Sequence, residues 1–234
     1  MAISRAKGNM YDWVTHTHSH LRGKCPHSCL YCYVQAMEKG PYGRGYYSGD
    51  LRIDEYSLKV KYGSGKTIFI DHCNDLFAKD VPDDWIDRVM FQCRSFNDNT
   101  YVFQSKNPER MWQWVKHMPK LVMLGTTIET DTYHAFTWDA CCPSPYERLK
   151  SMFMHKRQAP TFITIEPIMR MFSPSEFARG IANCMPTFVN VGADSKGSKG
   201  LSEPTGDEVR EFIAALRENG VTISKKSNLE RLLK

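Results

Sequence analysis

The sequence contains no long hydrophobic run, no internal repeat and no low-complexity segment. A membrane-spanning helix needs roughly 18 or more consecutive apolar residues, and no stretch of this chain approaches that length. The first residues, MAISRAKGNMYDW, also lack the apolar centre of a secretory signal. We therefore expect a cytoplasmic protein that does not associate with membranes.

A strong charge of either sign is also lacking, because the 234 residues carry a formal net charge of only +5. Dedicated nucleic-acid-binding domains usually have clustered Lys and Arg and a more basic composition. The charge alone therefore indicates an ordinary mixed-charge surface with a mild preference for polyanions. No convincing linker divides the chain, and we expect residues 1–234 to form a single domain.

Cysteine, in contrast, is frequent, with eight cysteines in the chain. In a reducing compartment, cysteines indicate metal binding or reactive thiols rather than disulfides. Cys25, Cys29 and Cys32 lie in KCPHSCLYCYV (24–34) with the spacing C-x3-C-x2-C. Zinc sites and iron–sulfur clusters usually take four ligands, so a fourth is missing here. His27, inside the segment, leaves zinc open as an interpretation.

Short apolar runs alternate with helical stretches along the chain. The expected strands are 11–18, 67–71, 101–105, 120–129, 161–167, 187–193 and 221–224. The expected helices are 82–95, a helix that starts at Pro108, 174–184 and 207–219. Apolar strands that alternate with helices form a parallel sheet covered by helices, and right-handed crossovers curl it into a barrel or part of one. The predicted fold class is α/β, a partial (β/α)6 TIM-like barrel of parallel strands.

Polar or charged residues stand at the ends of five successive predicted strands. They are Asp71, Ser105 with Lys106, Thr127 with Glu129, Glu166, and Asp194. Strand ends often meet solvent and are polar for that reason alone. In parallel β–α barrels, however, this edge of the sheet carries the active site, and five polar ends in succession favour a ligand site. Residues 131–147 are expected to form a long loop or lid.

The cysteine spacing, with Tyr31 directly before the last cysteine, resembles the signature of radical S-adenosylmethionine enzymes. The resemblance implies that Cys25, Cys29 and Cys32 hold three irons of a 4Fe–4S cluster, and that S-adenosylmethionine binds the fourth iron. It also implies reductive cleavage of this cofactor to a 5′-deoxyadenosyl radical that abstracts a hydrogen atom from a substrate. An electron donor such as flavodoxin or ferredoxin is implied as a partner.

Further blocks carry the resemblance from about Trp13 to Lys226, among them TIFIDHCNDLFAKDVPDDWI, FQSKNPERM, LGTTIET and ITIEPIM. They are similar to phage and bacterial members of mostly unassigned activity. The Gly-Gly-Glu stretch that usually follows the second strand is absent, and DHCND stands in its place. By position, the resemblance implies cofactor contacts from Tyr31, Asp71, Asn74, Ser105, Lys106, Thr127, Glu129 and Glu166.

Candidates for the catalytic step are Cys73, Asp194 and Lys225. Cys73 follows the second strand, and some radical enzymes use a thiol as hydrogen donor. Cys93 and Cys184 lie on predicted helices and are interpreted as buried small apolar residues. Two further cysteines, Cys141 and Cys142, fall in the predicted lid without an assigned role.

The substrate is indicated only by the phage-like resemblance. It implies a modified thymine base in phage DNA, with isomerisation of an aminoacyl-thymidine adduct during DNA hypermodification, in the host cytoplasm if a phage encodes the chain. Lys196, Lys199, Lys225 and Lys226 are available for phosphate contacts. Two alternatives stay open. One is a radical enzyme that acts on a free nucleotide, an amino acid or RNA, and the other is a non-catalytic zinc-dependent binding module.

Overall fold

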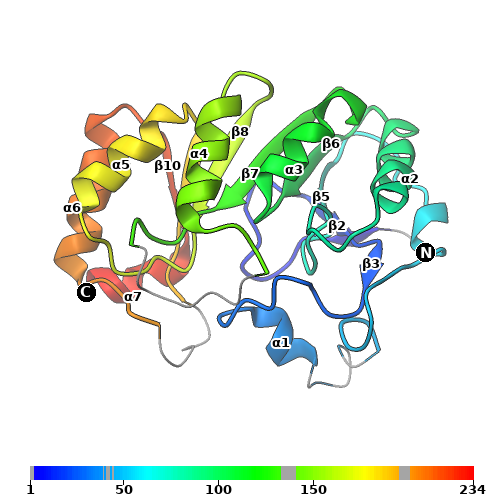
Figure 1. Cartoon of the computed structure of the whole chain (residues 1–234), viewed down its shortest axis with the longest axis horizontal. Helices are drawn as coiled ribbons and strands as arrows, with labels where there is room; N and C mark the ends of the chain where they lie inside the picture. The colour runs from blue at the N-terminus through cyan, green and yellow to red at the C-terminus, as the bar shows by residue number, and fades with distance from the viewer. Residues whose placement is uncertain (1–2, 39, 41–42, 44, 133–140, 195–200) are drawn as a thin grey trace. The chain divides into compact units, whose positions relative to one another are not determined.

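The computed structural model describes residues 3–38, 40, 43, 45–132, 141–194 and 201–234 (Figure 1). The chain divides into two compact units. The first consists of Met1–Ser28 with Cys32–Leu124, and the second of Cys29–Tyr31 with Gly125–Lys234. The cysteine segment therefore contributes residues to both units.

The first unit is built on a mostly parallel sheet. Its elements are β1 (Ser4–Arg5), β2 (His16–His18), β3 (Leu21–Arg22), α1 (Tyr33–Glu38), β4 (Arg52–Ile53), the 3-10 helix η1 (Ser57–Lys59), β5 (Thr67–Ile70), α2 (Asp83–Arg94), β6 (Thr100–Gln104), α3 (Pro108–Gln113) and the 3-10 helix η2 (Val115–His117). The strand order is β1-β2-β5-β6, in which β1 is antiparallel to β2 and the other pairs are parallel. In register, His16 lies opposite Ile68, and Thr67 lies opposite Thr100. β3 and β4 form a separate antiparallel ribbon.

The second unit repeats the β–α pattern. Its elements are the end of β7 (Val122–Thr127), α4 (Pro145–His155), β8 (Thr161–Ile165), α5 (Pro174–Asn183), β9 (Phe188–Val191), α6 (Gly206–Glu218), β10 (Ile223–Lys225), the 3-10 helix η3 (Ser227–Leu229) and α7 (Glu230–Leu233). The strand order is β7-β8-β9-β10, and β9 is parallel to both β8 and β10. In neither unit does the strand order close on itself as a full barrel would. The parallel β–α repeats of the two units confirm the predicted α/β class.

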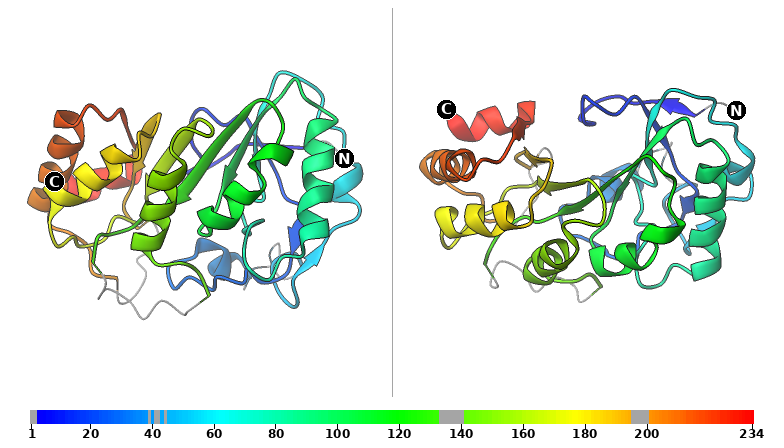
Figure 2. Two further views of the ribbon diagram at one scale, coloured as in Figure 1. Left: turned by 45° about the horizontal axis from the view of Figure 1, so that its top comes forward. Right: turned by 90° about the horizontal axis from the view of Figure 1, so that it is seen from above.

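The core of each unit is formed by apolar residues that recur at the spacing expected for buried helix faces and buried strands. In α2, buried residues recur at helical spacing, from Ile86 through Val89 and Met90 to Cys93. All five residues of β8 are buried, as expected for a strand covered on both faces. α5 and α6 pack side by side, as Figure 2 shows, and the rings of Phe177 and Phe212 stack with centroids 5.2 Å apart.

All seven expected strands are confirmed, six of them shorter than expected and the strand expected at 101–105 shifted by one residue to 100–104. The first was expected at 11–18 but covers only His16–His18, because the backbone turns between Tyr11 and Val14. The expected burial of Cys93 and Cys184 is also confirmed.

The end of the expected lid at 131–147 requires a correction, whereas its role as a lid stays a prediction. Its last residues form the first turn of α4, where Ser144 and Glu147 cap each other's backbone amides in a reciprocal capping box. Residues 133–140 of this segment lie outside the described part of the chain. None of the described helices combines the length and the apolar composition needed to span a membrane.

A close approach in the second unit yields a stability prediction. A Cβ atom at Gly125 in β7 would lie 2.2 Å from the ring of Phe162 in β8. We expect Gly125→Ala to lower the free energy of unfolding by about 1–3 kcal/mol, because the core must shift to accommodate the methyl group. Urea denaturation measures the change. Gly45→Ala is the control, because no atom lies within 4 Å of its added Cβ. Equal stability of the two variants would contradict the prediction.

Candidate functional site

The polar residues expected at strand ends do lie there. In the first unit, Asp71 follows β5 and Ser105 follows β6. In the second, Thr127 ends β7 and Glu166 follows β8. Because the carboxyl ends of parallel strands meet at one edge, each unit gathers polar side chains at that edge.

Asp71 is buried and stands in the left-handed backbone region, with φ of 53°. Its carboxylate accepts hydrogen bonds from the amides of His20 and Leu21 at 2.7 and 2.9 Å and from His20 Nδ1 at 3.0 Å. Burial alone would raise the pKa of Asp71, but His20 and these amides outweigh it and hold the pKa below its usual value. This carboxylate, expected to contact the cofactor, therefore binds the segment that precedes the cysteines.

Asp75, which sequence reasoning missed, joins three segments of the first unit. Its Oδ1 accepts hydrogen bonds from the Phe77 amide at 2.9 Å and from Ser105 Oγ at 2.8 Å. Its Oδ2 accepts from the Lys106 amide at 2.7 Å and pairs with His27 Nε2 at 2.7 Å. Burial would raise the pKa of Asp75, but His27 and the hydrogen bonds lower it further than burial raises it. Ser105 and Lys106, expected as cofactor contacts, are thus held through this carboxylate.

Cys73 lies in the same loop and is buried. The Tyr33 hydroxyl lies 3.6 Å from its Sγ and donates to the His72 carbonyl at 3.0 Å. Burial raises the pKa of Cys73 although hydrogen bonds with Tyr47 and Tyr33 oppose the change, so the thiol keeps its proton at neutral pH. The neighbouring Asn74, an expected cofactor contact, donates through Nδ2 to the Gly23 carbonyl at 3.2 Å.

In the second unit, Glu129 and Arg148 form a fully buried ion pair. Arg148 donates to both carboxylate oxygens, at 3.1 and 2.8 Å, and also to the Thr127 carbonyl. The Tyr31 hydroxyl donates to Glu129 as well. Burial, followed by the charge of Glu129, raises the pKa of Tyr31 well above its usual value. Tyr31, Thr127 and Glu129 are therefore brought together, with Arg148 as a partner that the sequence analysis did not name.

Glu166 is also held within the second unit. Lys226 Nζ donates to its Oε2 at 2.7 Å, and Asn228 Nδ2 donates to its Oε1 at 2.9 Å. A Cβ atom at Gly192 would lie 2.9 Å from Glu166 Oε1, so a side chain there would displace this carboxylate from its present position.

The two remaining catalytic candidates, Asp194 and Lys225, belong to the second unit. Asp194 is largely buried, and its backbone carbonyl accepts a hydrogen bond from Arg231 at 2.8 Å. Lys225 ends β10 and is exposed. Of the lysines expected to meet phosphates, Lys196 and Lys199 lie outside the described residues.

The donor set of the cysteine segment fits an iron–sulfur cluster. Cys25, Cys29 and Cys32 are each partly exposed, and none is in a disulfide. Iron–sulfur clusters are held by cysteine thiolates, and three cysteines that are partly exposed and outside disulfides meet that requirement. Among the described residues, no three His, Cys, Asp or Glu side chains are already gathered as a metal site.

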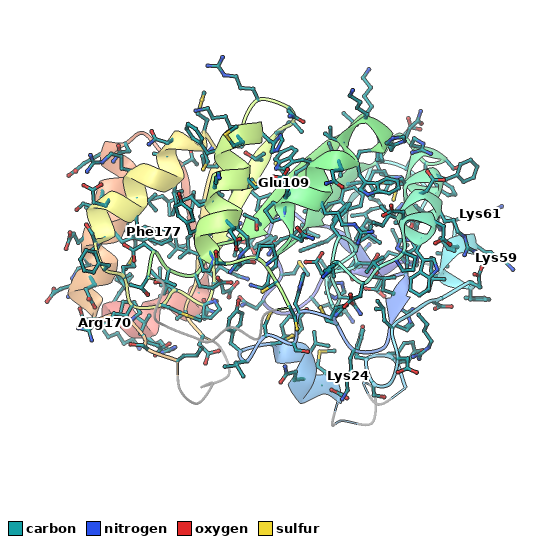
Figure 3. The ribbon with its side chains drawn as sticks, viewed as in Figure 1. Lys24, Lys59, Lys61, Glu109, Arg170 and Phe177 are labelled. Carbon is teal, nitrogen blue, oxygen red and sulfur yellow. The ribbon has the colours of Figure 1, made fainter. Side chains whose placement is uncertain are left out.

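The segment is held in place between its first two cysteines. His27 is buried, and because the Asp75 carboxylate can only accept, His27 Nε2 donates to it. Lys24, labelled beside α1 in Figure 3, approaches Glu38 at 3.5 Å, and the exposure of Lys24 makes this a weak pair.

The buried ion pair of the second unit yields a stability prediction. We expect Arg148→Met to lower the free energy of unfolding by about 3–5 kcal/mol, because it leaves the buried Glu129 without its countercharge. Arg179→Met is the control, since this arginine pairs with Glu176 on the surface of α5 and contributes about 0–1 kcal/mol. Urea denaturation at neutral pH distinguishes them. If both variants unfold at the same urea concentration, the buried pair is not essential to the unit.

Comparison with solved structures identifies the fold. A spore photoproduct lyase complexed with dinucleoside spore photoproduct aligns with a TM-score of 0.63 and 11% identity, over 94% of this chain and 79% of that one. A variant of that enzyme with bound AdoMet (S-adenosylmethionine) and dinucleoside spore photoproduct gives a TM-score of 0.62 at 11% identity, over 95% and 80%. A radical SAM methyltransferase from Sphaerobacter thermophilus aligns with a TM-score of 0.56 and 10% identity, over 93% of this chain and 67% of that one.

At such low identity these likenesses show a shared fold, and they confirm the fold that the cysteine motif implied, that of radical S-adenosylmethionine proteins. No curated protein matches the sequence. The family described as "Protein of unknown function (DUF5131)" matches residues 9–177, well over half of the chain. This chain therefore belongs to that family.

Proposed function

We propose that this chain is a radical S-adenosylmethionine enzyme. The observation that carries the proposal is the C-x3-C-x2-C segment, with three partly exposed cysteines outside any disulfide, in a chain with this fold. Cys25, Cys29 and Cys32 would hold a 4Fe–4S cluster through their thiolates. When bound, the cluster supplies the electron that cleaves S-adenosylmethionine and so begins hydrogen abstraction from a substrate.

The chain's own residues position and protect this chemistry. Asp75 fixes the backbone at Lys106, whose ammonium is the proposed partner of the cofactor's carboxylate. Glu129 holds the Tyr31 hydroxyl and Arg148 in a buried arrangement that excludes water. Cys73 keeps its proton because its pKa is raised, and it is the proposed hydrogen donor. Asp194 and Lys225 remain proposed contributors to the catalytic step.

The proposed substrate is a modified thymine base in DNA, with isomerisation of an aminoacyl-thymidine adduct. Support comes from the spore photoproduct lyase structures, whose bound ligand is a dinucleoside. A base within duplex DNA would have to be flipped out of the stack to reach a buried thiol such as Cys73. An electron donor such as flavodoxin or ferredoxin is part of the proposal.

The first experiment tests radical initiation. We expect the anaerobically reconstituted protein, given dithionite and S-adenosylmethionine, to release 5′-deoxyadenosine, measured by mass spectrometry. Cys29→Ala should abolish the product, because this thiolate is a proposed iron ligand. Cys184→Ala should retain it, because this buried thiol ends α5 and donates to the carbonyls of Leu149 and Gly180. A colourless protein that holds only zinc would refute the proposal in favour of a binding module.

The substrate class is tested by binding. We expect gel-shift experiments to show DNA binding that weakens steeply between low and physiological salt, because contacts to phosphates release counterions. Lys225→Ala, which removes an exposed cation, should reduce the salt dependence. The absence of any shift even at low salt would contradict a polymer substrate and favour a free nucleotide or amino acid, whereas a shift with RNA alone would favour RNA.

A further inference from the structure

The cysteine segment carries a residue that points inward, between two of the proposed iron ligands. His27 stands two positions after Cys25 and two before Cys29, and it is 3% exposed, whereas both cysteines are partly exposed. Ser28 follows in the left-handed region with φ of 48°, and its amide donates to the Cys25 carbonyl at 3.3 Å. The tight turn lets one side chain of this short segment be buried while the thiols stay accessible.

The partner of His27 is a carboxylate that is itself fixed on all sides. Asp75 receives hydrogen bonds from its own loop through the Phe77 amide, and from the loop after β6 through Ser105 and Lys106. A carboxylate with this many donors cannot rotate without breaking several hydrogen bonds, and charge-assisted bonds of this kind are among the strongest in proteins. Asp75 is therefore a rigid attachment point for whatever binds its remaining face.

We propose that His27 is a positioning residue that anchors the cysteine segment to Asp75, and so holds the thiolates ready for the iron–sulfur cluster. The inference rests on the proposed function. His27 Nε2 donates to Asp75 Oδ2 at 2.7 Å, within the first unit, and joins the segment to the loops after two parallel strands. Residues that orient metal ligands without touching the metal commonly change its affinity about 10- to 100-fold when they are removed.

The test is cluster retention in the full-length protein, measured without any catalytic assay. Wild type, His27→Ala and His27→Gln are reconstituted anaerobically with iron and sulfide. Iron per chain, the rate of iron loss to a chelator and the EPR spectrum of the dithionite-reduced cluster are then recorded. We expect His27→Ala to lose iron about tenfold faster than wild type and to show an altered spectrum. His27→Gln should recover much of the retention, because its side-chain amide can still donate to Asp75.

A general loss of stability must be separated from a loss of positioning. Gly125→Ala serves as the matched control, because it strains the second unit at Phe162 and leaves the His27–Asp75 pair unchanged. It should keep the wild-type rate of iron loss and the wild-type spectrum even if it unfolds at lower urea concentration. His27→Ala keeps every hydrogen bond of Asp75 within the two sheet loops, so we expect it to fold.

The outcomes distinguish the inference from the proposed function. If wild type binds iron and His27→Ala retains it at the same rate with an unchanged spectrum, the anchoring role is refuted and the proposed function stands. If Gly125→Ala loses iron as fast as His27→Ala, general instability explains the loss and the anchoring role is again refuted. If wild type takes up no iron, both proposals fail.

Discussion

The hydrogen bond between His27 and the buried carboxylate of Asp75 joins the cysteine segment to the loops that follow two parallel strands. The segment 24–34 contains Pro, His, Ser and three cysteines, and of its apolar side chains Val34 is buried whereas Leu30 is exposed. It cannot be held in place by hydrophobic packing alone. A charged acceptor fixed to the sheet supplies the missing attachment, because a buried carboxylate must be satisfied by donors or its burial is strongly unfavourable.

The same physical solution recurs in both units. Asp71 binds the two amides at the start of β3, and Glu129 binds Tyr31 together with the buried guanidinium of Arg148. Each carboxylate directly follows a strand or stands just beyond its end, where the sheet gives way to loops. These groups therefore serve as attachment points for chain that leaves the sheet. Of the carboxylates expected to contact a cofactor, Asp71, Glu129 and Glu166 all bind protein groups, and the position of each at a strand end remains compatible with a second role.

Sequence reasoning located the strands and the polar residues that follow them because both depend on local patterns. Apolar runs such as TIFI and TFITI predict buried strands, and the first polar residue after each run lies at the sheet edge by necessity. The capping box at Ser144 and Glu147 is also a local signal, and it marks the start of α4, a helix that the sequence analysis did not expect because it interpreted this region as a lid. Arg148 gave no such signal, because an arginine in the first turn of a helix usually faces solvent.

The amino-acid sequence by itself determined the alternation of strands and helices, the cysteine spacing and the set of polar residues at strand ends, since each is encoded by residues close together in the chain. Only the tertiary structure decided the partners of those residues. His27 meets Asp75 across 48 positions, Tyr31 meets Glu129 across 98, and Lys226 meets Glu166 across 60. Such pairings depend on which strands become neighbours and on where each loop leaves the sheet, and no local propensity specifies either.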